Sequence, residues 1–190
     1  MAADFIYRIA DLYYIFFYRF ISLFCNIVFV ISDSHSAINP IIFRRLKNAG
    51  TIIHAGDWST TDVYHDLLEI TGNIYAVHGN TETREIDELF PEVRMIELYG
   101  KKIYIRHEVE SAKNFKLFSN EEKIDIVISG HTHKVLKKKI KGTVFYNPGS
   151  CGPKRFANRA PSYGVIYFFG KFFFIFTHRV YFQKREGSFL

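Results

Sequence analysis

The chain has 190 residues, of which 48% are hydrophobic and 23% charged, with 12 glycines and 5 prolines. These proportions exclude a disordered or low-complexity protein and provide for one sizeable core, and two cysteines, Cys25 and Cys151, exclude a disulfide-stabilised scaffold. The net charge of +6 is concentrated in residues 134–190, where 12 basic residues meet one acidic residue, and it suits an anionic ligand, although no recognised motif favours nucleic acid.

The first 25 residues form an aromatic-rich extension in front of one domain at 26–190. Apolar residues recur there at positions 5, 9, 12, 16, 20 and 24, which predicts an amphipathic helix. Arg19 interrupts the apolar stretch and no small-residue cleavage site follows, so we expect no transmembrane span and a cytoplasmic protein. The apolar face would dock on the domain, on a second copy in a homo-oligomer or on a membrane surface, unless the extension has no function.

From residue 26 onward, short apolar runs rich in Ile, Val and Tyr repeatedly end in a polar or turn residue, as buried strands do. The six runs are 26–32, 51–55, 74–77, 102–106, 124–129 and 143–146. Helices are predicted at 37–48, 59–71 and 111–122. The segments 135–140, 143–146, 163–169 and 172–181 predict antiparallel hairpins. Alternating strands and helices indicate an α/β protein with two packed sheets flanked by helices.

The residues that follow these runs are mostly of the types that bind metal ions. Loops beyond the carboxyl ends of strands form the site in such sheets, so we expect these side chains to lie together. They are Asp33, His35, Asp57, Asn80, His107, His131 and His133. A single site uses three or four ligands, so seven predict two divalent metals with a bridging carboxylate, for which Asp57 is suited. Mixed imidazole and carboxylate ligands favour Mn²⁺, Fe, Zn²⁺ or Ni²⁺ over Ca²⁺ or Mg²⁺, and such a metal pair is typical of displacement at phosphorus. We expect Mn²⁺ first, with Ni²⁺, Fe, Zn²⁺ or Mg²⁺ as alternatives.

The order of motifs is specific: D-x-H, G-D, G-N, H and G-H-x-H, followed by N-P-G-S. Together they resemble the calcineurin-like metallophosphoesterases, and the compact size resembles their small YfcE-type phosphodiesterase subgroup. The resemblance covers residues 26–181 and implies a four-layer α-β-β-α sandwich of two mixed sheets flanked by helices. It implies one metal held by Asp33, His35, Asp57 and His133, and a second held by Asp57, Asn80, His107 and His131. Catalysis would involve Asp57, Asn80 and His107, with a metal-bridging hydroxide attacking the phosphorus of a phosphate ester.

Departures from the family pattern refine this expectation. Thr81 follows Asn80 where many members have a histidine proton donor, which favours a phosphodiesterase over a monoesterase. Substrate phosphate contacts are expected from Asn80, His78 and Arg155. Glu108 stands where the subgroup often has glycine, and it would tune the second metal or obstruct the substrate.

Four residues of metal-binding type receive other roles. His54, His65 and His178 belong to no motif, and we expect them to pack or to face solvent. Glu82 is expected to begin a helix or to support the ligands, and not to bind metal itself. The alternative function is a non-catalytic protein-binding scaffold on the same fold, like the retromer scaffold subunit. The presence of all seven ligand types favours the enzyme.

Overall fold

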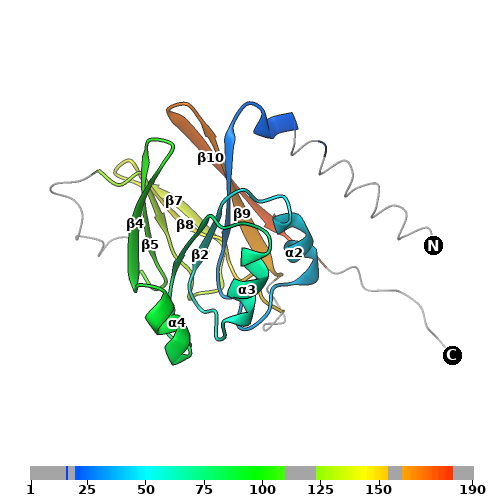
Figure 1. The fold of residues 1–190 in the computed structure, drawn as a ribbon. Helices are drawn as coiled ribbons and strands as arrows, with labels where there is room; N and C mark the ends of the chain where they lie inside the picture. The colour runs from blue at the N-terminus through cyan, green and yellow to red at the C-terminus, as the bar shows by residue number, and fades with distance from the viewer. Residues whose placement is uncertain (1–15, 17–19, 110–122, 154–159, 182–190) are drawn as a thin grey trace, which may run out of the picture.

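The computed structural model describes residue 16 and residues 20–109, 123–153 and 160–181 (Figure 1). Most of the predicted N-terminal extension, the helix predicted at 111–122 and Arg155 therefore lie outside the described residues. Within the described ranges, no helix is both long and apolar enough to cross a membrane. The division of the chain at residue 25, and an oligomer formed through the extension, stay predictions.

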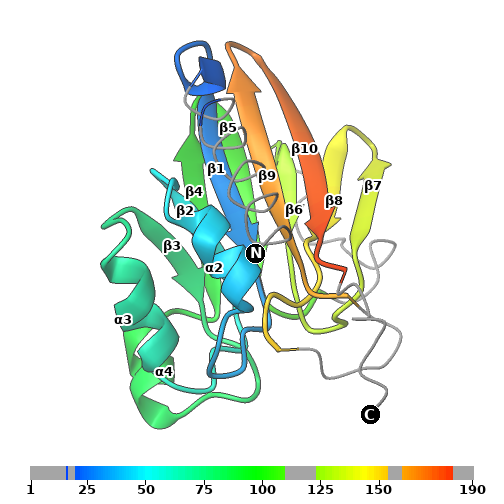
Figure 2. The same ribbon diagram turned by 90° about the vertical axis from the view of Figure 1, so that its right-hand side faces the viewer.

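Two five-stranded mixed sheets pack face to face, as predicted (Figures 1 and 2). The first has the order β10-β9-β1-β2-β3 and contains β1 (Asn26–Ile31), β2 (Ile52–Ala55), β3 (Ile74–Val77), β9 (Ser162–Phe169) and β10 (Phe172–Arg179). The second has the order β4-β5-β6-β8-β7 and contains β4 (Val93–Leu98), β5 (Lys101–Arg106), β6 (Ile126–Ile128), β7 (Leu136–Ile140) and β8 (Thr143–Asn147). A core of aliphatic and aromatic side chains from both sheets fills the space between them.

The direction of the strands brings their polar ends to one rim. Strands β1, β2 and β3 are mutually parallel in the first sheet, and β5, β6 and β8 are mutually parallel in the second. These are the six apolar runs that the sequence predicts. Because parallel strands end on the same side, the loops that carry the predicted ligands meet where the two sheets face each other.

Helices cover the outer face of the first sheet. The helices are α2 (Pro40–Leu46), α3 (Asp62–Leu68) and α4 (Arg84–Leu89), and the first two pack Leu46 and Leu67 into one cluster with Phe29 of β1. Helix α2 begins later than predicted because Asn39 caps it, its side chain accepting a hydrogen bond from the Ile41 N–H at 3.0 Å. On the outer face of the second sheet, a smaller cluster gathers around Tyr104; the helix predicted to cover it lies outside the described residues.

The edge strand β10 exposes a row of aromatic side chains. Phe172, Phe174 and Phe176 are each more than half exposed, whereas Phe173 and Ile175 turn toward the second sheet. Helices α2 and α3 pack over β1, β2 and β3. Neither of these helices covers the aromatic row of β10, which is exposed on the outer face of the first sheet in the described part of the chain.

A glycine sets the distance between the sheets. Gly164 of β9 faces the ring of the buried Tyr146 on β8, and a Cβ atom at position 164 would collide with the Tyr146 hydroxyl. Gly164→Ala is therefore expected to lower the free energy of unfolding by about 1–3 kcal/mol, measured by urea denaturation. Gly72→Ala is the control, because nothing lies within 4 Å of a Cβ atom there. Equal stability of the two variants would contradict this close packing.

Candidate metal centre

All seven predicted ligands lie at the rim between the sheets, in the loops after five strands. Asp33 and His35 follow β1, Asp57 follows β2 and Asn80 follows β3. From the second sheet, the loop after β5 carries His107, and the loop after β6 carries His131 and His133. The site is therefore assembled from both sheets.

Four of the seven form one compact cluster: Asp33, His35, Asp57 and His133 each offer a ligand atom, and these atoms lie within 4.8 Å of one another. The Nε2 atom of His35 is 3.1 Å from Nε2 of His133 and 3.7 Å from Oδ2 of Asp57. Nε2 of His133 is 3.2 Å from Oδ1 of Asp33. Both carboxylates are buried. Two imidazoles and two carboxylates converging in this way fit the donor set of a transition-metal ion.

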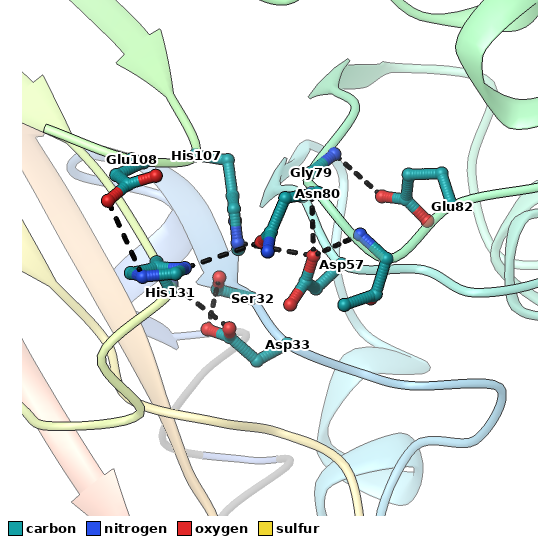
Figure 3. A network of polar contacts seen from close by, with 12 residues as sticks. Ser32, Asp33, Asp57, Gly79, Asn80, Glu82, His107, Glu108 and His131 are labelled. Carbon is teal, nitrogen blue, oxygen red and sulfur yellow. Dashed lines mark hydrogen bonds and ion pairs between the residues drawn. The ribbon is translucent and has the colours of Figure 1, made fainter.

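The remaining three, Asn80, His107 and His131, gather beside Asp57 (Figure 3). Oδ1 of Asp57 is 3.2 Å from Nε2 of His107 and accepts a hydrogen bond from the Asn80 backbone N–H at 3.0 Å. Nδ1 of His131 is 3.3 Å from the side-chain oxygen of Asn80. Asp57 thus contacts residues of both groups.

The ring of His107 faces the Asp57 carboxylate. Its Nδ1 is 2.7 Å from the Ala55 carbonyl oxygen, which places a ring proton on Nδ1. Its Nε2 is buried, makes no hydrogen bond to the residues that the structure describes, and lies 3.2 Å from Oδ1 of Asp57. A buried polar atom without a hydrogen bond is costly in a native protein. A cation shared with Asp57, either a second ring proton or a metal ion, would satisfy it.

The backbone is strained at the candidate ligands. Asp33, His35, Asp57, His131 and His133 have φ angles between 47° and 66°, in the left-handed region. Although Asp and His enter this region more readily than most residues, each instance still has a cost, of the order of 1 kcal/mol. Five such residues in one site indicate that the fold holds these side chains in place for a function.

Three glycines allow the loops to approach one another. A Cβ atom at Gly56 would collide with the ring of His107, one at Gly79 with Asp57, and one at Gly130 with the hydroxyl of Ser32. These are the glycines of the G-D, G-N and G-H motifs. Their presence beside the ligands therefore has a steric reason.

Charge interactions keep Asp57 ionised. Burial by itself would raise its pKa, but the neighbouring His107 imidazole and the Asn80 N–H outweigh burial, so the pKa lies well below its ordinary value. Burial would likewise lower the pKa of His107, but the Asp57 carboxylate outweighs it and raises that pKa. The second carboxylate, Asp33, accepts hydrogen bonds from the Ser32 hydroxyl at 2.6 Å and from the His131 N–H at 3.0 Å. Sequence reasoning missed Ser32, although a polar residue ending a buried strand could have identified it.

Glu82 supports the site by binding the backbone of the ligand loops (Figure 3). Its carboxylate accepts backbone hydrogen bonds from Trp58 at 3.0 Å, Ser59 at 2.7 Å and Gly79 at 2.7 Å. These bonds tie the loop after β2 to the loop after β3, and so fix Asp57 relative to Asn80.

Of the residues predicted to touch substrate besides Asn80, the structure describes His78 and not Arg155. Nδ1 of the half-buried His78 lies 2.9 Å from the Gly79 carbonyl oxygen and 3.5 Å from Asp87 of α4, so this ring contacts its own loop and a helix. Arg155 lies outside the described residues. Oε1 of the exposed Glu108 is 3.5 Å from Nε2 of His131, at the mouth of the second group (Figure 3).

The histidines outside the motifs do not join the cluster. His54 is buried, stacks on Trp58 with ring centroids 3.5 Å apart, and lies 3.0 Å from the Ser34 hydroxyl. His178 stacks on Tyr163, and His65 is exposed on α3. Cys151 is buried, and burial raises the pKa of its thiol, which makes it an unreactive packing residue.

Removing the Glu82 carboxylate tests its supporting role. Glu82→Ala is expected to weaken Mn²⁺ binding by about 10-fold or more, because three backbone N–H groups lose the acceptor that holds the ligand loops. Isothermal titration calorimetry measures the affinity. Glu88→Ala is the matched control, since Glu88 is exposed on α4 and pairs with Arg84. Unchanged affinity in Glu82→Ala would show that the loops hold their positions without it.

The buried His54 predicts a dependence of stability on pH. Burial lowers the pKa of His54 well below its ordinary value, so the unfolded chain takes up a proton near pH 6.5 that the folded chain excludes. The free energy of unfolding should therefore fall below pH 6.5, by up to about 1.4 kcal/mol per pH unit from this residue. Urea denaturation of chelator-treated protein at pH 7.5 and 5.5 measures the fall. His54→Asn should reduce it and His65→Asn should not; an equal fall in His54→Asn would refute the prediction.

The sequence and the fold match known proteins. Residues 27–168 match the calcineurin-like phosphoesterase superfamily domain. A phosphodiesterase of Methanocaldococcus jannaschii is 25% identical over 138 residues, which cover 64% of this chain and 82% of that protein. Among solved structures, Vps29 of Cryptosporidium parvum aligns with a TM-score of 0.66 and 23% identity, over 87% of this chain and 94% of that one. YfcE, a phosphoesterase from E. coli, aligns with a TM-score of 0.56 and 18% identity, over 74% and 90%. The chain belongs to the calcineurin-like phosphoesterase superfamily.

Proposed function

We propose that this protein is a phosphodiesterase that depends on two divalent metal ions, with Mn²⁺ the first candidate. The observation that carries the proposal is the buried Nε2 of His107, which makes no hydrogen bond to the described residues and faces the ionised Asp57 carboxylate at 3.2 Å. The superfamily match supports phosphate esters as substrates, and the relative from M. jannaschii supports a diester.

The ligands divide into two groups that share Asp57. Asp33, His35, Asp57 and His133 would hold one metal, and Asp57, Asn80, His107 and His131 the other. Bound there, the metals would lower the pKa of a water molecule and neutralise charge on the phosphoryl oxygens. The hydrogen bond to the Ala55 carbonyl orients His107. Asn80 donates its backbone N–H to Asp57, and its side-chain oxygen lies 3.3 Å from Nδ1 of His131, so this oxygen would bind the second metal and the amide nitrogen would donate to a phosphate oxygen.

The preference for diesters follows from the residue after Asn80. Thr81 places its backbone N–H 3.3 Å from Oδ1 of Asp57, and its side chain cannot act as an acid near neutral pH. Without an imidazole there, the leaving group must depart with its charge stabilised electrostatically, which suits leaving groups of low pKa. A diester also carries one negative charge less than a monoester dianion.

A comparison of two substrates with the same leaving group tests this preference. The value of kcat/KM with Mn²⁺ should be higher for bis(4-nitrophenyl) phosphate than for 4-nitrophenyl phosphate. A higher value for the monoester would contradict the diesterase. If protein with both metals bound hydrolyses neither, the non-catalytic scaffold becomes the better explanation, with Glu108 beside His131 as the first residue to replace.

Asp57→Asn tests the shared ligand. The substitution removes the charge common to both groups, so we expect less Mn²⁺ bound per chain and a fall in kcat of about 100-fold or more. Metal content and diester hydrolysis are measured on the same sample. Asp66→Asn, at an exposed position on α3, is the control. Wild-type protein that binds at most one Mn²⁺ at saturation would refute the two-metal site.

A further inference from the structure

A hollow of about 250 Å³ opens beside the candidate metal centre, and His133 forms part of its wall together with Lys134, Ser162, Arg179 and Tyr181. We infer that this hollow is an anion-binding subsite, which takes a second negatively charged group of the substrate, a carboxylate or a phosphate. The inference rests on the proposed function, since the phosphorus undergoing attack would lie at the metal centre next to it.

The topology of the first sheet brings Arg179 to this rim. Strand β9 runs antiparallel to β1, with Gly164 opposite Val30, so β9 begins where β1 ends and the ligand loop starts. Strand β10 returns alongside and pairs Arg179 with Ser162. Alternation places Arg179 on the same face as Thr177, which hydrogen-bonds the Tyr146 hydroxyl of the second sheet at 3.0 Å. Arg179 therefore lies at the rim, on the face of β10 directed toward the second sheet.

The second cation comes from the other sheet. Lys134 directly follows His133, in the loop between β6 and β7. The hollow is thus lined by one cation from β10 of the first sheet and one from a loop of the second, together with His133 of the candidate metal centre.

Neither cation is neutralised by a carboxylate among the residues that the structure describes. Other basic side chains have partners: Arg106 pairs with Glu92 at 2.5 Å, and Lys101 pairs with Asp125 at 3.7 Å. Two like charges facing one hollow repel each other. An anion bound between them attracts both cations and so offsets that repulsion. The arrangement is therefore suited to an anionic guest.

The chemistry of the residues that line the hollow indicates which kind of ligand it would bind. The Ser162 hydroxyl is buried and donates to the Pro148 carbonyl oxygen at 2.6 Å, so its proton is already engaged. Arg179 offers the planar donor pair that matches a carboxylate or phosphate, and Lys134 adds a point charge. The volume is small for a ligand pocket, which indicates a compact anionic group joined to the phosphorus by a short linker.

Binding of phosphonates, which are not hydrolysed, tests the subsite without turnover. Calorimetry with Mn²⁺-loaded protein compares 3-phosphonopropionate with propylphosphonate, and 5-phosphonopentanoate with pentylphosphonate. In at least one pair, the carboxylate compound should bind about 5-fold tighter or more to the wild type. The double variant Lys134→Gln/Arg179→Gln should lose that difference and retain its affinity for the alkylphosphonates. Lys138→Gln/Lys139→Gln removes two exposed charges of β7 and should keep the difference.

Each outcome separates the subsite from the proposed function. Equal affinity of the wild type for both members of both pairs would overturn the subsite and leave the phosphoesterase proposal standing. A difference that survives in the Lys134/Arg179 double variant would overturn the assignment to these residues. If no phosphonate binds the metal-loaded protein, the proposed function fails and the subsite fails with it.

Discussion

The contact on which the site depends is the one between the two sheets at Asp57 and His107. His107 reaches across from the second sheet, fixes its ring on the Ala55 carbonyl and faces the Asp57 carboxylate. The contact requires Gly56, because any larger residue there would collide with the ring. It joins the loop after β2 in the first sheet to the loop after β5 in the second. The remaining ligands follow β1, β3 and β6 of the same two sheets.

The rim has an acidic region and a basic region. Around Asp33 and Asp57, buried carboxylates are stabilised by imidazoles and backbone N–H groups, an environment that a divalent cation completes. A short distance away, toward β10, the wall turns cationic with Lys134 and Arg179. A site that is negative at its centre and positive at its flank is suited to a metal and to the anionic ester of the proposed function. The first sheet supplies both carboxylates and Arg179, and the second adds Lys134 and the imidazoles of His107, His131 and His133.

The sequence predicted the strands that carry ligands because each is a buried apolar run that ends abruptly in a polar residue. Strand β4 was not predicted, since Val93–Leu98 alternates between exposed and half-buried positions at a sheet edge and has no such run. Helix α4 was missed because six residues with Ile86 as their buried side chain give almost no periodicity. The way Glu82 joins two loops depends on three backbone N–H groups, which no side-chain pattern reveals. Lys134 and Arg179 are far apart in sequence, and only the hairpin return of β10 brings them to one hollow.

The left-handed backbone at the ligands has a consequence for how this fold evolves. Replacing Asp33 or Asp57 by glycine would remove a buried charge and relax a strained φ angle in one step. The left-handed φ angles are thus a cost that these positions add to folding, while the hydrogen bonds that Asp33 and Asp57 accept act in the opposite direction. In a lineage released from hydrolysis, the first effect would favour glycine at both positions and the second would oppose it. A chain with all seven ligand types keeps the strained loops together with the side chains that they present.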